Sequence, residues 1–201
     1  MASDKGGKFE RDQSRFLSLW WSEGKDPDIF WRNRTRATQF APKAEHQLSD
    51  QMCTKSSGLP FTETFSVELK SGYSKQKASR LKNQKGQGKF RNVPWDLLEI
   101  IDSNQIDDYL TILQFWKQCQ TDADITGRIP ILIFKRDFHQ PVVCMKSADL
   151  DILWKCKNRG KYPERNIVLE SGNFDLEFFR QDDFFKWLTP KMVKELHKER
   201  K

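Results

Sequence analysis

Hydrophobic and polar residues alternate along residues 64–70, whose sequence is Thr-Phe-Ser-Val-Glu-Leu-Lys. Aromatic and β-branched residues at a period of two are typical of a β-strand with one buried face. The hydrophobic side chains of this strand project to one side, whereas Glu68 and Lys70 project to the other. A carboxylate and an ammonium group therefore share the polar face near the end of the strand. They form either an exposed ion pair or part of a site for a cation.

Shorter patterns precede this strand. Hydrophobic residues at spacings of three to five predict a helix over residues 5–23, and an extended apolar run follows at 29–31. Residues 49–54 predict another strand, joined to a strand over 61–70 by the turn-forming segment Lys-Ser-Ser-Gly-Leu-Pro. The two strands together predict an antiparallel hairpin.

The geometry of such a hairpin brings charged side chains together. A turn centred near Leu59 places Asp50 directly opposite Glu68 on the same face, with their Cβ atoms about 4.5–5.5 Å apart. Two adjacent carboxylates repel each other unless a cation lies between them, so this pair indicates metal binding more than stability. We therefore expect Asp50, Glu68 and Lys70 to cluster at one end of the hairpin.

Patterns further along the chain predict a mixed sheet. Helices are expected over 94–101 and 106–120, and the run at 129–134 is apolar enough for a central strand that is covered on both faces. Another strand is expected at 141–145. A strand followed by helices and a central strand is a βαβ-type crossover, which predicts an α/β fold with a mixed central β-sheet flanked by helices.

The last part of the chain predicts an α+β extension. A short helix is expected at 150–154, a strand at 166–170 and a basic helix at 190–201. Phe and Trp residues are dense between 174 and 188. They either cover one side of the sheet or bind a partner.

The composition bounds the class of protein. The 201 residues suffice for one sizeable domain with additions, and we expect a core over 1–146 with an extension over 147–201 that packs on it or forms an interface. Hydrophobic content of 37% with fifteen Phe is typical of a globular chain. No apolar run approaches the roughly 20 residues of a membrane span, and the N-terminus lacks an apolar signal region. We expect no membrane partner and a cytoplasmic location, in the host cytoplasm if the chain is viral.

The four cysteines form no Cys-x-x-Cys pair, and the three histidines do not flank them. A zinc site is therefore not expected, and free thiols are.

The net charge of +7 is concentrated in one stretch. Residues 1–69 hold ten basic and ten acidic residues, residues 92–201 hold seventeen and eighteen, and the basic loop over 70–91 holds eight basic and no acidic residues. Such a block favours a polyanion. The residues expected to contact phosphates are Arg32, Arg34 and Arg36, which alternate after the first apolar run or lie on a solvated loop, and Lys75, Lys77, Arg80, Lys82, Lys85, Lys89 and Arg91.

Acidic residues occur in an order that suggests a family. Glu10 lies on the first helix, Asp50 enters the hairpin, and Glu68-Leu69-Lys70 ends the next strand before the crossover to a strongly apolar strand. This order and spacing resemble the PD-(D/E)XK restriction-like nuclease superfamily. The segment 6–11 and the Phe-Trp-Arg run at 30–32 look like its small bacteriophage-type members, some of them similar to Holliday-junction resolvases.

The resemblance covers residues 6–145 and implies a restriction-endonuclease-like core. Ser49 stands where the family often has Pro or Gly before the aspartate. Glu45 and Glu63 are therefore alternatives to Asp50 as the second carboxylate.

The resemblance implies metal-assisted hydrolysis of DNA phosphodiester bonds. Asp50, Glu68 and the carbonyl of Leu69 would hold Mg²⁺ or Mn²⁺, which polarises the scissile phosphate and lowers the pKa of a bound water. Lys70 would orient that water or stabilise the developing charge. Glu10 would complete the shell, directly or through water. A Holliday-junction substrate further implies a homodimer, because the junction offers two equivalent strands.

Other functions stay open at the level of the sequence. A nucleic-acid-binding protein without catalysis would keep the basic loop and disperse the acidic cluster. A sequence-selective or repair nuclease would share the chemistry and differ in substrate. A structural protein that uses its aromatic C-terminal segment would show little salt-dependent affinity for DNA.

Overall fold

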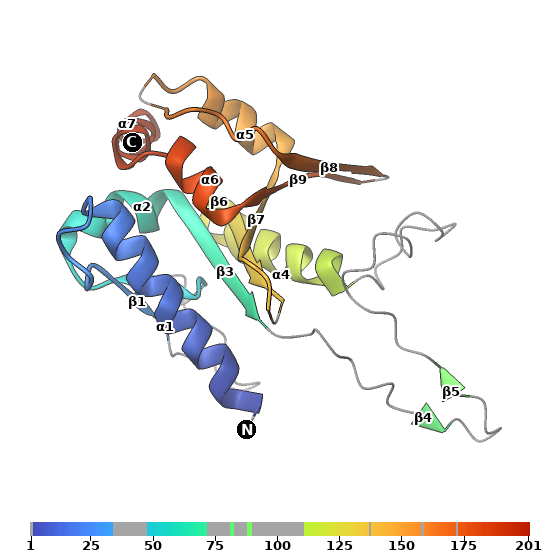
Figure 1. Ribbon diagram of the computed structural model, residues 1–201. Helices are drawn as coiled ribbons and strands as arrows, with labels where there is room; N and C mark the ends of the chain where they lie inside the picture. The colour runs from blue at the N-terminus through green and yellow to red at the C-terminus, as the bar shows by residue number, and fades with distance from the viewer. Residues whose placement is uncertain are drawn as a thin grey trace.

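A five-stranded mixed sheet with helices on both faces forms the centre of the protein (Figure 1). The computed structural model describes residues 2–33, 48–71, 81–82, 88–89, 111–136, 138–157, 159–171 and 173–201. The strands, in order across the sheet, are β3 (Phe65–Ser71), β6 (Ile129–Lys135), β7 (Val142–Lys146), β9 (Phe174–Arg180) and β8 (Asn166–Ser171). β3 and β6 are parallel, and the other neighbours are antiparallel. The predicted α/β fold with a mixed central sheet is confirmed.

The remaining elements lie around this sheet. The helices are α1 (Ala2–Trp21), α2 (Leu59–Thr64), α4 (Thr111–Thr126), α5 (Ser147–Trp154), α6 (Gln181–Trp187) and α7 (Pro190–Glu199). A short 3-10 helix, η2 (Ser56–Gly58), precedes α2. Two separate pairs of antiparallel strands are β1 (Phe30–Arg32) with β2 (Gln51–Cys53), and β4 (Leu81–Lys82) with β5 (Gly88–Lys89). Among the described helices, none has the length and apolar character that crossing a bilayer requires.

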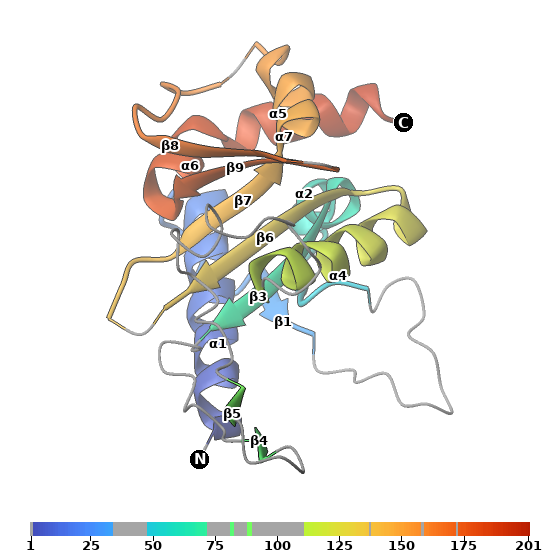
Figure 2. The ribbon, with the colours of Figure 1, turned by 90° about the vertical axis from the view of Figure 1, so that its right-hand side faces the viewer.

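Each face of the sheet has its own hydrophobic core because side chains alternate along the strands. Ile131 and Ile133 of β6 belong to a core built with α1, α5, α6 and α7. Leu132 and Phe134, on the opposite face, pack with α4. The strand β6 is therefore covered on both sides, as predicted for the run at 129–134, and Figure 2 shows α4 on one side of it and α1 on the other.

The aromatic residues of the C-terminal segment are divided between these cores: Phe174 and Phe178 pack in the second, and the others in the first. Phe184, Phe185 and Trp187 are buried there. The indole Nε1 of Trp20 on α1 donates a hydrogen bond to the carbonyl of Phe185 at 2.7 Å. Of the two interpretations of the aromatic patch, the structure supports the one in which it covers a face of the sheet.

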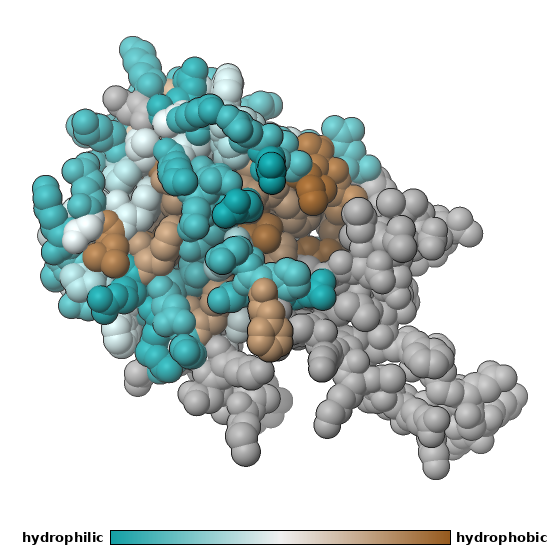
Figure 3. All heavy atoms as spheres, in the orientation of Figure 1, coloured by the Kyte–Doolittle hydropathy of each residue, from teal (hydrophilic) through white to brown (hydrophobic). Residues whose placement is uncertain are grey.

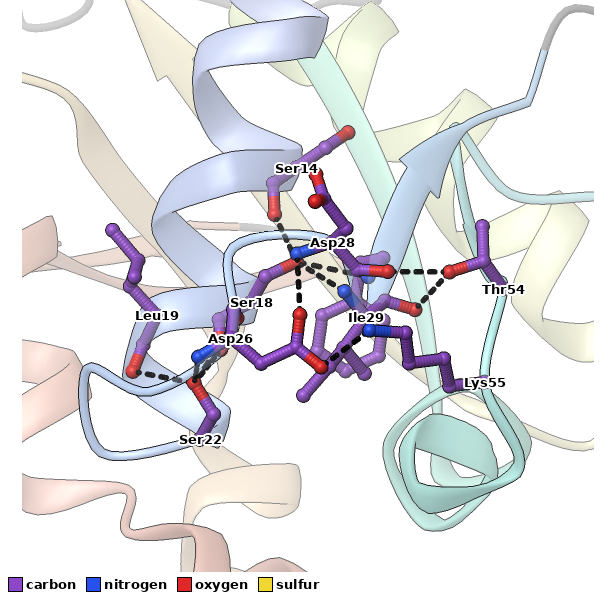
Figure 4. Close-up of polar contacts among 10 residues, drawn as sticks. Ser14, Ser18, Leu19, Ser22, Asp26, Asp28, Ile29, Thr54 and Lys55 are labelled. Carbon is purple, nitrogen blue, oxygen red and sulfur yellow. Dashed lines mark hydrogen bonds and ion pairs between the residues drawn. The ribbon is translucent and has the colours of Figure 1, made fainter.

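Serine side chains fix the chain that leaves α1 (Figure 4). Ser18 Oγ accepts hydrogen bonds from the backbone N–H of Ile29 at 3.1 Å and of Phe30 at 2.8 Å. Gly58 closes in from the other side, where an added Cβ would come within 2.9 Å of both the Ile29 and Phe30 side chains. β1 therefore lies directly against α1, and only a glycine fits at position 58 without a shift of these neighbours.

The predicted hairpin is wrong as an element. β2 pairs with β1, and residues 59–64 form α2, so the second strand begins at Phe65 instead of residue 61. Pro60 lies in the first turn of α2, where its missing N–H costs no hydrogen bond, so the turn segment leads into a helix. One edge of β3 is taken by β6 in a parallel pair. The long-range crossover thus replaces the local hairpin.

The sheet continues past the predicted boundary at residue 146. β9 of the segment 147–201 pairs with β7 of the segment 1–146, and residues from both segments share one core. The division into a core and an extension stays a prediction.

The four cysteines are free thiols, as expected.

Candidate active site

Glu68 is a buried carboxylate on β3, an edge strand of the sheet. It lies on the β3 face that packs against α4, and 3% of the residue is exposed. Its Oε1 accepts a hydrogen bond from Nε2 of Gln118 on α4 at 2.8 Å and forms an ion pair with Nζ of Lys70. A charge this far from water requires such partners, because unpaired burial of a carboxylate is costly.

Lys70 lies two residues further along β3 and on the same face. Its Nζ donates to Oε1 of Gln118 at 3.1 Å and lies 5.5 Å from the centroid of the Phe115 ring. The ammonium group is thus held by β3 and α4 together. Two adjacent turns of α4 therefore position the Glu68–Lys70 pair.

Asp50 lies beside this pair. Its backbone N–H donates to the Val67 carbonyl at 2.8 Å, and its Oδ2 accepts from the Leu69 N–H at 2.8 Å. The segment before β2 therefore runs along the free edge of β3 for a short distance, although no hairpin forms. Asp50 and Glu68 therefore lie side by side, as the predicted hairpin required. The contact is made by the segment before β2 and not by a hairpin strand.

The electrostatics of Asp50 follow from this placement. The pKa of Asp50 is raised from 3.8 to about 7, mainly by burial and also by the negative charges of Glu68 and Glu10. The Leu69 N–H and the Lys70 charge act in the opposite direction. Close to neutral pH the site therefore favours a bound proton or a bound cation over two bare carboxylates.

Glu10 and Arg32 lie at the border of this cluster. Oε2 of Glu10 is 3.7 Å from Nη1 of Arg32, and the same nitrogen donates to the Gly7 carbonyl at 3.5 Å. The Arg32 side chain is 17% exposed. Arg32 therefore packs on α1 beside Glu10, whose charge reaches Asp50, and most of its surface is covered by this chain.

The oxygen donors suit a hard divalent cation. The described residues contain no group of three or more His, Cys, Asp or Glu side chains placed to hold a metal. The metal ligands predicted from the sequence are the carboxylates of Asp50 and Glu68 and the backbone carbonyl of Leu69. Carboxylate and carbonyl oxygens are the ligands that Mg²⁺ and Mn²⁺ prefer, so these residues fit such an ion.

Several predicted residues fall outside this cluster. Arg34, Arg36, Glu45, Lys75, Lys77, Arg80, Lys85 and Arg91 lie outside the described residues. Lys82 and Lys89 lie on β4 and β5, where the side chains are not described. Glu63, an alternative second carboxylate, ends up on α2 with His197 and Lys201 each 3.3 Å from its Oε2. It lies before the start of β3, at the opposite end from Lys70.

Gln118 was not found from the sequence. It bridges Glu68 and Lys70, although its place in the helical pattern gives no signal because it is exposed between the buried positions Trp116 and Cys119. Only the docking of α4 on the polar face of β3 brings it to the site. In a βαβ unit, polar residues on the sheet-facing border of the crossover helix are the ones to examine for this role.

The Glu-x-Lys pattern of β3 differs from the other occurrences in this chain because its glutamate is buried. It occurs at 23–25, 68–70 and 199–201. Glu23 is exposed in a turn with a φ of 55°, and Glu199 is exposed at the end of α7. Only at 68–70 does the glutamate lie buried on a strand.

Comparison with known proteins gives one match. A family model described as "Phage putative PDDEXK endonuclease" matches residues 94–195, just over half of the chain. Neither a curated protein nor a solved structure matches. The matched segment contains α4 with Gln118 and the strands β6, β7, β8 and β9. It begins after β3, and no Asp-x-Lys or Glu-x-Lys occurs in it. The chain belongs to the phage PDDEXK endonuclease family.

Proposed function

We propose that this protein is a metal-dependent DNA endonuclease whose catalytic residues are Asp50, Glu68 and Lys70. The observation that carries the proposal is the buried Glu68 carboxylate, which Lys70 and Gln118 hold beside Asp50. A bound Mg²⁺ or Mn²⁺ would supply Lewis acidity at the scissile phosphate. Asp50, Glu68 and the Leu69 carbonyl would hold it, with Glu10 completing the shell.

The residues of the chain supply positioning and charge. A water oxygen forms a bond to phosphorus and gives up a proton to the solvent, while the bond to the leaving oxygen breaks and that oxygen takes up a proton from the solvent. The Lys70 ammonium stabilises the negative charge that develops on the phosphate oxygens. Gln118 keeps Lys70 and Glu68 in place, so the ammonium points at one position instead of sampling several.

We propose branched DNA, such as a four-way junction, as the substrate, with duplex DNA as the alternative. The basic loop over 70–91, with Arg34 and Arg36, would contact the backbone without reading the base sequence. We further propose a homodimer that acts in the cytoplasm. Its contact between copies lies at β8, the last strand of the sheet, where Ile167 and Val168 are exposed. Figure 3 shows hydrophobic side chains gathered at this side of the described part.

The test is cleavage of four-way, forked and linear duplexes of the same sequence with Mg²⁺ or Mn²⁺. We expect four-way DNA to be cut fastest and Lys70→Met to remove cleavage without weakening DNA binding. Equal rates on all substrates would contradict the structure-selective part of the proposal. A wild type that binds DNA but cuts none of these substrates would contradict the nuclease itself.

One observation favours a second function, binding without catalysis. Lys70 forms a direct ion pair with Glu68, which also satisfies a purely structural role for both residues. Isothermal titration with Mn²⁺ separates the two. If the site is that of a nuclease, the wild type binds Mn²⁺ and Glu68→Gln does not. If the pair is structural, neither the wild type nor Glu68→Gln binds Mn²⁺.

A further inference from the structure

A second group of basic residues surrounds a cavity on the opposite half of the sheet. Four basic side chains, Lys161, Arg165, Arg180 and Lys186, line a cavity of about 430 Å³ together with Tyr162, Pro163, Glu164 and Asp183. The residues come from the connection between α5 and β8, from the end of β9 and from α6. None of them was singled out by the sequence patterns.

The connection is fixed tightly against α6. The backbone N–H of Gly160 donates to the Trp187 carbonyl at 2.7 Å, and an added Cβ on Gly160 would lie 2.0 Å from the Lys186 carbonyl oxygen. The ring of Tyr162 packs on that of Trp187 with centroids 5.2 Å apart, and its hydroxyl donates to Glu177 at 3.1 Å. The basic residues that follow Gly160 are therefore held on an ordered wall of the cavity.

The carboxylates around the cavity do not balance the cations. Asp183 is shared between Arg180, at 3.8 Å, and Lys186, at 3.7 Å, and Glu164 pairs with Lys161. Four positive and two negative side chains leave an excess of two positive charges at the cavity. An anion with several oxygens, such as a phosphodiester, matches both this excess and the presence of two arginines.

The cavity lies at the same end of the sheet as the candidate active site. Lys70 pairs with Phe134, Phe134 with Val142, and Val142 with Arg180 in successive strand registers. Three strand spacings of about 4.8 Å give a separation on the order of 14 Å between the Cα atoms of Lys70 and Arg180. Glu68 and Lys70 face α4, whereas Tyr162 and α6 pack on the other face, so one DNA molecule would reach both sites around this end of the sheet. Figure 2 shows β3, β6 and β9 ending along one side of the sheet.

We propose that this cavity binds a backbone phosphate of the same DNA whose scissile phosphate lies at Glu68 and Lys70. This inference rests on the proposed function. A DNA strand advances about 3.4 Å per nucleotide along the helix axis, so phosphates about 14 Å apart are separated by about four nucleotides or fewer. The cavity thereby extends the grip on DNA into the half of the chain that carries no candidate catalytic residue.

The experiment compares two double variants that each remove two positive charges. Lys161→Gln with Arg165→Gln alters the cavity, and Lys191→Gln with Lys198→Gln alters exposed positions on α7. Binding to a duplex of about 30 bp is measured by fluorescence anisotropy in Ca²⁺ across a salt series. We expect the cavity variant to bind this duplex about tenfold more weakly, with a salt slope lower by about 0.9 because one phosphate contact is lost.

The control variant and two further outcomes make the test decisive. Equal weakening by both double variants, or no weakening by the cavity variant, would overturn the inference. Thermal shifts with inorganic phosphate are measured as well, because a site for free phosphate offers the same chemistry. Stabilisation by phosphate that is lost in the cavity variant, while its affinity for the duplex stays unchanged, would also overturn the inference. A wild type that shows the expected binding pattern but never cuts would refute the nuclease and support the cavity.

Discussion

The two halves of this chain carry different kinds of information. Residues 94–195 match a nuclease family model and build four of the five strands, but they contain no Asp-x-Lys or Glu-x-Lys. Residues 2–71 lie outside the match and contain Asp50, Glu68 and Lys70. A family match can therefore identify the scaffold of an enzyme while its candidate chemistry lies on a strand beyond the matched segment.

The halves meet where that chemistry would occur. β3 pairs with β6 along its full length, and Gln118 of the matched half contacts both Glu68 and Lys70 of the other. Family membership is thus informative about the site because the matched half holds the proposed catalytic residues in place. Substitutions in each half can test whether one half supplies the chemistry and the other positions it.

The largest expected effect is on cleavage when Glu68 is changed. Glu68→Gln removes one negative charge at the proposed cation site but keeps the side-chain volume, so cleavage with Mn²⁺ should fall by about 10³-fold or more. The matched control is Glu170→Gln, an exposed carboxylate of the family-matched half, which should stay within about twofold of the wild type. The measurement is single-turnover cleavage of four-way DNA. Full activity in Glu68→Gln would place the chemistry in the matched half and reverse the comparison.

Much of the fold was predictable from local patterns. The run at 129–134 is apolar throughout and became β6, and the alternation at 64–70 placed Glu68 and Lys70 on one face as predicted. These predictions succeeded because side-chain periodicity follows directly from strand geometry. The helix over 5–23 also matches α1 closely.

The failures concern contacts between distant segments. The hairpin was wrong because a turn-rich segment with Pro60 also suits the first turn of a short helix, and sequence alone does not choose between them. Gln118 was missed because its role depends on how α4 docks on β3. The cavity at Arg180 was missed because residues 92–201 are balanced in charge overall, which hides a local excess.

The next effect is on stability and comes from Asp50. Its pKa in the folded protein is raised to about 7, above the unfolded value, so it stabilises the fold when protonated. That stabilisation is present below about pH 4 and is lost as the pH rises to about 7. Asp50→Asn keeps a neutral side chain at every pH, so at about pH 8 in EDTA its free energy of unfolding should exceed that of the wild type by about 1–3 kcal/mol.

Urea denaturation at about pH 4 and about pH 8 measures this difference. The gap between Asp50→Asn and wild type should widen with pH, and Mn²⁺ should narrow it by stabilising the wild type alone. The variant should also lose cleavage. A lower stability of Asp50→Asn at about pH 8 would mean that the hydrogen bond from the Leu69 N–H outweighs the cost of burying the charge.

A smaller effect is expected at the contact between the halves. Gln118→Leu removes the hydrogen bonds to Glu68 and Lys70 while the rest of α4 stays packed, so cleavage should fall by about 10- to 100-fold. Gln120→Leu on the same helix is the control and should have little effect. Because Gln118 is a positioning residue, the pH profile of cleavage should also shift in Gln118→Leu. A fall in rate with an unchanged profile would point to loss of stability instead.

The smallest effect tests how firmly α1 is tied to the matched half. Trp20→Phe keeps an aromatic ring against Phe185 but removes the hydrogen bond from Nε1 to the Phe185 carbonyl, which should cost about 1 kcal/mol in the free energy of unfolding. Trp31→Phe, at a position that is 40% exposed, is the control and should cost less. Because both halves contribute to one core, a single unfolding transition is expected in each variant. Two separated transitions in Trp20→Phe would show that the halves fold independently. The matched half would then position Glu68 and Lys70 without stabilising the fold of β3.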